Sequence, residues 1–249
     1  MASFHHRIKS GRKGSAKEHA AYIERLGRYS DREDLVYAGN GNMPDWTEGN
    51  PATFWKAADT YERANGAAYR EHVIALPNEL SLEQNCALAM GLARELVGNK
   101  PFQLAVHAPE GSLGGITNLH MHLMYSDRVP DGIGRPPERM FARYNSERPE
   151  DGGCRKDSGG RSPMALRDQV ISTRKKIADI QNQALEEHGF NARVDHRSLR
   201  EQGLQRRPER HLGPARIKGM SDSEKALFAT LRATGSAGGP PRSATLATS

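Results

Sequence analysis

The amino-acid sequence predicts an α/β (α+β) domain in which helices flank a central, mostly antiparallel sheet. Two observations predict this fold class. Short apolar segments with the character of strands alternate along the chain with amphipathic segments that begin at helix-capping residues. Two of the strand segments, 102–108 and 119–126, are joined by a Gly-rich loop with no helix between them, and such neighbours are expected to pair antiparallel.

Capping residues and glycines set the bounds of the expected helices. Ser15 and Ser81 each stand three residues before a Glu or a Gln, which is the spacing of a capping box, and Asn50 precedes a proline at the first helical position. The expected elements are a strand over 3–9, a helix from 15 to about 27, a polar, turn-rich stretch over 30–49, a helix from 50 to 66, a strand over 69–76, a helix from 81 to 98, the strands at 102–108 and 119–126, an Arg-, Gly- and Pro-rich stretch over 127–163, and a long helix that ends at Gly189.

The composition changes after Gly213-Pro214, where Ser, Ala, Thr, Gly and Pro become dominant. Such a composition is typical of a segment with little buried core. We therefore expect one domain over residues 1–215 and a loosely ordered tail or linker over 216–249, with a short helix around 224–232.

The charge of the chain suggests a polyanionic partner. The 249 residues include 36 Lys and Arg against 30 Asp and Glu, a net charge of +6 with histidine neutral. A basic surface attracts nucleic acid by releasing counterions. No segment approaches the roughly 20 apolar residues of a membrane span, the N-terminus lacks the apolar segment of a secretory signal, and two cysteines exclude a disulfide framework. These features predict a cytoplasmic protein that is not embedded in a membrane.

Three histidines form the strongest candidate site. His120 and His122 are two residues apart on an expected strand, so their side chains leave the same face, and His107 ends the strand that should pair with it. Three neutral imidazoles that converge on one point can hold a divalent cation and leave positions open for a substrate oxygen. The alternative is a set of half-buried histidines bonded to backbone carbonyls. The spacing favours the metal site without choosing among Zn, Mn, Co, Ni and Mg.

Tyr22, in the first expected helix, can be interpreted in two ways. A tyrosine at such a position commonly packs its ring and leaves its hydroxyl in water. A phenolic oxygen can also act as a nucleophile when a nearby cation or base activates it. Composition and spacing alone do not separate Tyr22 from the other candidate tyrosines, Tyr29, Tyr37, Tyr61 and Tyr69.

Several motifs occur together in one order along the chain. They are Ala20-Ala21-Tyr22-Ile23, the run Tyr61–Gly66, Ala75-Leu76-Pro77-Asn78-Glu79-Leu80, the run Asn118–Met124, Asp131-Gly132-Ile133 and Asp195-His196-Arg197-Ser198-Leu199. In this order they resemble the relaxase domain of the MobA/MobL plasmid-mobilisation proteins, within the wider group of HUH endonucleases. The resemblance extends from the first strand through Gly213-Pro214.

The resemblance implies a reaction and the residues that perform it. Relaxases of this family nick one strand at the plasmid origin of transfer and stay attached to its 5′ end through a tyrosine. Carried over to this sequence, the nucleophile is Tyr22 and the ligands of a divalent metal such as Mn, Mg or Zn are His107, His120 and His122. Glu79 matches a carboxylate that orients a histidine or accepts a proton; its alternative role is to stabilise the start of the helix that follows it.

The resemblance also implies partners. They are single-stranded origin-of-transfer DNA with an adjacent inverted repeat, auxiliary mobilisation proteins and a type IV coupling protein. DNA contacts are expected from the basic segment between Arg128 and Lys176, with Phe141 and Tyr144 stacking on unpaired bases. The alternative there is a solvated basic surface with aromatic side chains in the core. The sequence departs from the family in two ways. The stretch 108–119 between the two histidine-bearing strands is long, and Leu119 stands where proline is common. Both departures concern the shape of the loop over 108–119 and its DNA contacts.

The sequence is compatible with three other functions. A rolling-circle replication initiator would use the same chemistry at a replication origin. A metal-dependent phosphodiesterase that activates water would cleave DNA without a covalent adduct. A DNA-binding accessory protein would bind without cleaving or needing a metal.

Overall fold

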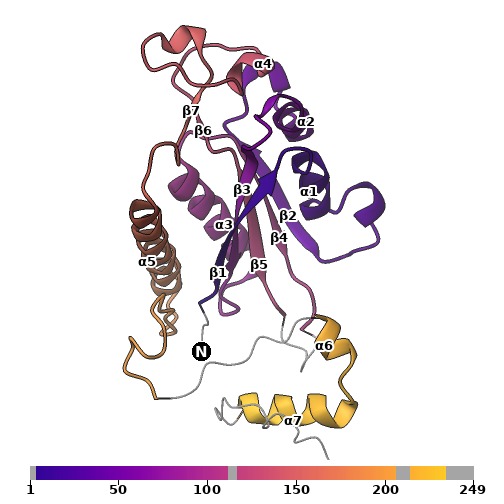
Figure 1. Ribbon diagram of the computed structural model, residues 1–249. Helices are drawn as coiled ribbons and strands as arrows, with labels where there is room; N and C mark the ends of the chain where they lie inside the picture. The colour runs from indigo at the N-terminus through magenta and orange to yellow at the C-terminus, as the bar shows by residue number, and fades with distance from the viewer. Residues whose placement is uncertain (1–3, 112–116, 206–213, 234–249) are drawn as a thin grey trace, which may run out of the picture. The chain divides into compact units, whose positions relative to one another are not determined.

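A five-stranded antiparallel sheet forms the centre of the sheet domain (Figure 1). The computed structural model describes residues 4–111, 117–205 and 214–233. The strand order is β1-β3-β5-β4-β2, so the strand with the His-x-His motif is the innermost one. The strands are β1 (His6–Arg12), β2 (Leu35–Gly41), β3 (Ala67–Ala75), β4 (Phe102–His107) and β5 (His120–Tyr125).

One face of the sheet is covered by α3 (Leu82–Val97) and α5 (Pro163–Glu187). Alternate residues of the central strands point to this side and bury their apolar side chains against the two helices. This core includes Ile74, Leu104, Met121 and Leu123 from the sheet, Leu88 and Leu92 from α3, and Ile177 and Leu185 from α5.

The opposite face of the sheet is covered by α1 (Ala16–Ile23) and α2 (Pro51–Tyr61). Phe54 and Trp55 of α2 are fully buried there, and the Trp55 indole donates a hydrogen bond of 2.7 Å to Gln103 Oε1. The three histidines belong to this face, because His107 and His122 alternate with the apolar residues that face α3 and α5.

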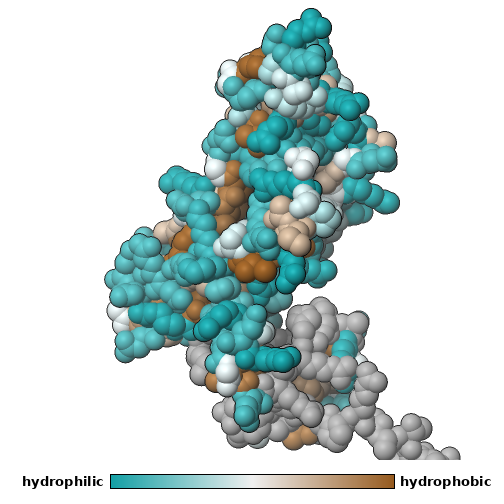
Figure 2. Space-filling view, turned by 60° about the vertical axis from the view of Figure 1, so that its left-hand side comes forward, coloured by the Kyte–Doolittle hydropathy of each residue, from teal (hydrophilic) through white to brown (hydrophobic). Residues whose placement is uncertain are grey.

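Smaller elements follow the central strand. They are β6 (Arg128–Val129), α4 (Pro137–Met140), a 3-10 helix at Pro149–Asp151 and β7 (Arg155–Lys156). Two further 3-10 helices, Gly27–Tyr29 and Asp45–Thr47, flank β2. Residues 1–109 and 119–196 make up the sheet domain, while α6 (Pro214–Lys218) and α7 (Asp222–Ala233) belong to a second compact unit. The side of the molecule in Figure 2 is mostly hydrophilic, with hydrophobic residues in small, separate groups.

Most of the expected elements are confirmed. The sheet is antiparallel, β4 pairs with β5 as expected, and the capping box at Ser81 is formed with Gln84. The helix around 224–232 is present as α7. The long helix after the basic segment runs from Pro163 to Glu187 and ends just before Gly189.

Three expectations about local structure were wrong. The stretch 30–49 contains an edge strand, β2, in which Gly41 permits the close approach of Phe102; a Cβ at Gly41 would lie 2.5 Å from that ring. The helix that begins at Pro51 ends at Tyr61, five residues before Gly66. The Ser15 hydroxyl makes no capping bond and instead donates to the carbonyl of Arg12.

Some expectations fall outside the described residues. The Gly-rich loop before β5 lies largely on 112–116, and the last part of the expected tail lies on 234–249. The division into a domain over 1–215 and a tail from 216 stays a prediction. Among the described helices, none combines the length and the apolar character that crossing a membrane requires.

Candidate metal centre

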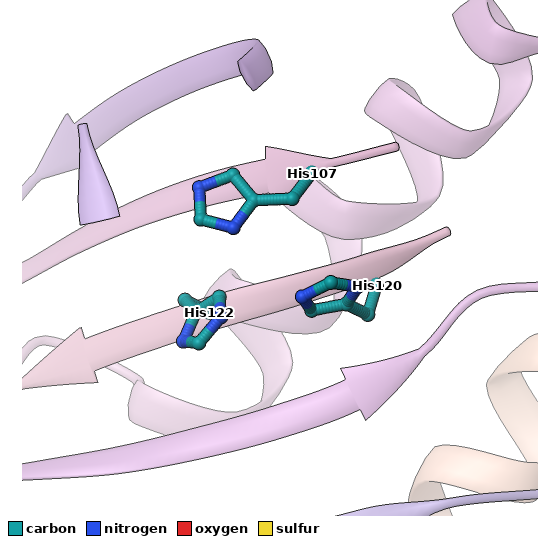
Figure 3. A group of neighbouring side chains, drawn as sticks. All are labelled: His107, His120 and His122. Carbon is teal, nitrogen blue, oxygen red and sulfur yellow. The ribbon is translucent and has the colours of Figure 1, made fainter. Parts of the chain in front are cut away.

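The structure brings His107, His120 and His122 together on the α1 side of the sheet (Figure 3). The register of β4 and β5 places His107 directly opposite His120 and Ala105 opposite His122. The ring centroids are 4.9 to 5.5 Å apart, and one nitrogen from each ring lies within 4.8 Å of the others. His107 and His122 are buried and His120 is half-buried, so the cluster has one side through which a substrate can approach.

The histidines have the chemistry of metal ligands. Burial lowers the pKa of His107 to about 4, so its ring is neutral at pH 7, as a ligand must be. Its two nitrogens are both bonded: Nε2 donates to the Ile23 carbonyl at 2.7 Å, and Nδ1 accepts from Arg25 at 3.1 Å. For His107 to act as a ligand, one of these two hydrogen bonds has to give way. An all-nitrogen donor set suits Zn, Co or Ni better than Mg.

Glu71, a residue that sequence reasoning missed, supports the cluster from β3. Its side chain is fully buried, and Oε1 accepts hydrogen bonds from His122 Nδ1 at 2.6 Å and from His19 Nε2 at 2.8 Å. Burial acts to raise the pKa of Glu71, but the hydrogen bonds from His122 and His19 outweigh it and hold the pKa well below its usual range. The carboxylate therefore fixes the His122 ring with Nε2 left for a ligand.

Tyr22 lies in the last turn of α1, next to the residue that contacts His107. The helix end is held there because the Ile23 carbonyl accepts the hydrogen bond from His107. The half-buried Tyr22 ring has two guanidinium groups over it, Arg25 at 4.8 Å and Arg32 at 5.5 Å from the ring centroid. The His19 ring stacks on Tyr22 at 5.9 Å, so a chain of contacts leads from Tyr22 through His19 and Glu71 to His122.

Arg25 is a second residue that the sequence did not single out. It has a φ of 57°, which side chains other than glycine rarely adopt, and it is buried. Its guanidinium forms a bidentate pair with Asp34 at 2.7 and 2.8 Å, donates to the Tyr22 carbonyl at 2.9 Å and reaches His107. Arg25 thus fastens the end of α1 to the strand that carries His107.

Glu79 lies in the turn that follows β3. Ala75, the last residue of β3, pairs with His120, and the chain then enters the turn that contains Glu79. The side chain of Glu79 is half-buried. Its role as an assisting carboxylate stays a prediction.

Two of the expected DNA contacts are contradicted by burial. Phe141 is 1 % exposed and packs against Phe54 in the core, so it cannot stack on a base. Arg128 is 2 % exposed and is bound to Glu62 and to three backbone carbonyls. Both belong to the packing between α2 and the segment after β5, whereas Tyr144 is half-buried and borders a pocket.

Comparisons with known proteins identify relatives over most of the chain. Residues 14–221 match the sequence model of the MobA/MobL family. The chain is 42 % identical over 209 residues to the "43 kDa relaxation protein" of Salmonella typhimurium, covering 83 % of this chain and 56 % of that protein. It is 45 % identical over 220 residues to "Mobilization protein A" of Escherichia coli, covering 86 % of this chain and 30 % of the relative. The chain therefore spans about half and about a third of these two proteins.

A solved structure supports the fold. The chain described as "Molecular Basis of Vancomycin Resistance Transfer in Staphylococcus aureus" superposes with a TM-score of 0.58 at 22 % identity, covering 79 % of this chain and all of that one. This likeness shows a common fold. Since the family's sequence model covers most of the chain and two of its relatives are more than 40 % identical to it, the protein belongs to the MobA/MobL family.

Proposed function

We propose that this chain nicks one strand of plasmid origin-of-transfer DNA by a metal-assisted transesterification and stays joined to the new 5′ end through Tyr22. The observation that carries the proposal is the position of the α1 end: the residue after Tyr22 is hydrogen-bonded to His107, one of three clustered imidazoles. The backbone of the helix that carries Tyr22 thus contacts the cation site, and a phenol and a cation that reach the same phosphodiester can act on it together.

The reaction balances without a co-reactant. The Tyr22 phenolic oxygen forms a bond to the scissile phosphorus, and the bond from phosphorus to the 3′ oxygen of the preceding nucleotide breaks. The phenolic proton is lost and the leaving 3′ oxygen takes up a proton. One phosphodiester replaces another, so the free 3′-hydroxyl can later reverse the step.

The residues around Tyr22 suit this task. Arg25 and Arg32 lie over its ring, so two positive charges flank the proposed nucleophile. His107, His120 and His122 would hold a divalent ion, which when bound polarises the scissile phosphate and stabilises the charge of the transition state. Glu71 orients His122. Glu79 is proposed as a further carboxylate at the His120 end of the site.

The partners implied by the family are part of the proposal. They are single-stranded origin DNA with an adjacent inverted repeat, auxiliary mobilisation proteins and a type IV coupling protein. The relatives that carry the names of mobilisation and relaxation proteins support this context.

The test is the formation of a covalent adduct. Single-stranded fragments that tile a plasmid mobilisation region, labelled at the 3′ end, are incubated with the protein and Mn²⁺ and then run on a denaturing gel. We expect the wild-type protein to carry the label, the adduct to disappear with Tyr22→Phe or with EDTA, and Tyr29→Phe to retain it. Tyr29 is the matched control because its ring touches that of Tyr22.

The other outcomes distinguish the rival functions. An adduct that persists in Tyr22→Phe would refute the nucleophile assignment. Cleavage without an adduct would indicate a phosphodiesterase that uses water, and binding without cleavage or metal dependence an accessory protein. Nicking at a replication origin rather than a transfer origin would indicate a replication initiator.

A further inference from the structure

A basic pocket of about 280 Å³ lies beyond the end of β5 that is opposite the histidines. Its lining includes Arg63, Arg128, Arg143, Arg155, Lys156 and Tyr144. The chain passes from His120 at one end of β5 to Arg128, three residues after the other end. At about 3.3 Å per residue, these eight residues give an upper limit of roughly 26 Å for the distance between His120 and Arg128.

The floor of the pocket is a cluster of one buried carboxylate and two cations. Glu62, which is 1 % exposed, lies 3.0 Å from Arg128 Nη2 and 3.2 Å from Lys156 Nζ. One buried carboxylate thus serves two cations. Burial acts to raise the pKa of Glu62, but the hydrogen bonds and charge of Arg128 lower it below its usual range. The floor therefore keeps an excess of one positive charge.

The rim of the pocket carries cations without carboxylate partners. Arg143 and Arg155 are exposed, and neither forms an ion pair with any residue that the structure describes. Arg63 is more than half exposed and is 3.8 Å from Glu62, the outer limit of an ion pair. Two nearby acids are bound elsewhere, because Asp127 pairs with Arg70 and Asp157 with Lys100. The pocket thus presents a concentrated positive charge to solvent.

The rim arginines stand on a fixed backbone. The Arg128 guanidinium donates to the carbonyls of Phe141, Ala142 and Cys154, the residues directly before Arg143 and Arg155. The two segments also pack closely, because a Cβ at Gly153 would lie 2.3 Å from the Ala142 carbonyl oxygen. Holding the backbone in place before a ligand arrives reduces the entropy lost on binding.

We propose that this pocket binds a phosphodiester of the DNA strand several nucleotides away from the nick, with Tyr144 packing on the adjacent sugar or base. The inference rests on the proposed function, since it takes DNA to be the substrate. The exposed guanidinium groups of Arg63, Arg143 and Arg155 can donate hydrogen bonds to the oxygens of a phosphate, and the excess positive charge of the floor adds to the attraction. Contacts of this kind position a strand without reading its sequence.

The experiment measures DNA affinity separately from cleavage. Fluorescence anisotropy with labelled dT30, dT6 and a 30-base-pair duplex is recorded in EDTA over a range of NaCl concentrations. The pocket variant is Arg143→Gln/Arg155→Gln. The control is Arg94→Gln/Arg193→Gln, which removes the same charge from exposed positions on α3 and after α5. Circular dichroism and thermal unfolding verify that both variants are folded.

For dT30, the loss of one neutralised phosphate should reduce the slope of log K against log salt by about 0.7, which corresponds to an affinity about fourfold weaker at 0.15 M salt. The control should bind like the wild type. We expect dT6 to show a smaller loss than dT30 because it is too short to require the pocket. If the variant loses equal affinity for dT30 and for the duplex, the pocket binds phosphates of both single-stranded and double-stranded DNA. If it loses affinity for dT30 alone, the pocket binds phosphates of the single strand.

Unchanged dT30 binding by the pocket variant would overturn the inference, as would an equal loss in the control, since the effect would then be one of net charge. Wild-type protein that binds none of the three DNAs would instead overturn the proposed function.

Discussion

At the scale of single residues, the carboxylate of Glu71 determines how the histidines are presented. It is buried in the middle of the sheet and accepts hydrogen bonds from two imidazoles, one in the cluster and one stacked on Tyr22. A charged acceptor fixes the tautomer of its partner ring, because His122 Nδ1 must carry the proton that it donates. Metal binding at His122 Nε2 therefore depends on the charge of Glu71.

Glu71→Gln should weaken metal binding by about 10- to 100-fold, because an amide accepts a weaker hydrogen bond than a carboxylate and can turn its NH₂ group toward His122. Isothermal titration calorimetry with Mn²⁺ or Co²⁺ measures the affinity. Glu95→Gln, the same change at an exposed position on α3, is the matched control and should bind like the wild type. Equal affinities in all three proteins would refute the role of Glu71.

The candidate site was predictable in part from the sequence. The two-residue spacing of His120 and His122 and the pairing of neighbouring strands were enough to bring the three histidines together, because the period of a strand fixes which side chains share a face. Glu71 required the knowledge that β3 lies beside β5, 51 residues away along the chain. Arg25 was not predictable, since its contacts depend on an unusual backbone conformation.

At the scale of elements, α1 is capped by a residue of another helix. The sequence indicated a local capping box at Ser15, but the carboxylate of Asp59 on α2 accepts hydrogen bonds from the backbone N–H groups of Gly14, Ala16 and Lys17 at 2.7 to 2.9 Å. The negative charge also lies at the positive end of the helix dipole. The sequence placed the start of this helix correctly at Ser15, but the group that caps it could not be deduced from local spacing because it lies on α2.

Asp59→Ala should lower the free energy of unfolding by about 1 to 2 kcal/mol, the usual effect of losing a helix cap. Ser15→Ala should change it by less than about 0.5 kcal/mol, because that hydroxyl caps nothing and is exposed. Urea unfolding of both variants and the wild type provides the comparison. If the Ser15 variant were less stable than the Asp59 variant, the cap of α1 would be Ser15 rather than Asp59.

The elements that the sequence predicted well are those with strong periodicity or complete caps. The long helix α5 and the capped helix α3 are of this kind. The edge strand β2 was missed because its half-buried residues end in Gly-Asn-Gly, a composition typical of turns. Its glycines serve the packing of Phe102, a contact that depends on tertiary structure.

At the scale of the whole molecule, stability should depend on pH through buried neutral histidines. Burial lowers the pKa of His6 to about 4, of His72 to about 3 and of His107 to about 4. His6 and His72 share a hydrogen bond of 2.9 Å on the opposite face of the sheet from the cluster, and the His72 ring stacks on Tyr125. Unfolding frees these groups to take up protons at an ordinary pKa near 6.5.

Because the unfolded chain binds more protons in this range, the free energy of unfolding should fall as the pH drops from 7 to 5. The expected loss is about 1 to 2 kcal/mol for each of the three histidines. Urea unfolding in EDTA at several pH values measures it. His72→Gln should show a shallower pH dependence than the wild type, whereas His188→Gln, at an exposed position, should match the wild type. A His72 variant with the full slope would contradict this account.

The two faces of the central sheet differ in a way that bears on how such a protein can diversify. Apart from the buried pair His6–His72, the side packed against α3 and α5 is an apolar layer, while the side toward α1 and α2 holds the three clustered imidazoles, Glu71 and the ion pairs around them. Neighbouring positions along β5 alternate between these two layers. Substitutions on the side toward α1 and α2 can therefore change which metal ion or which DNA a relative binds, while the other side keeps the fold stable. Mutations that alter binding need not cause loss of folding.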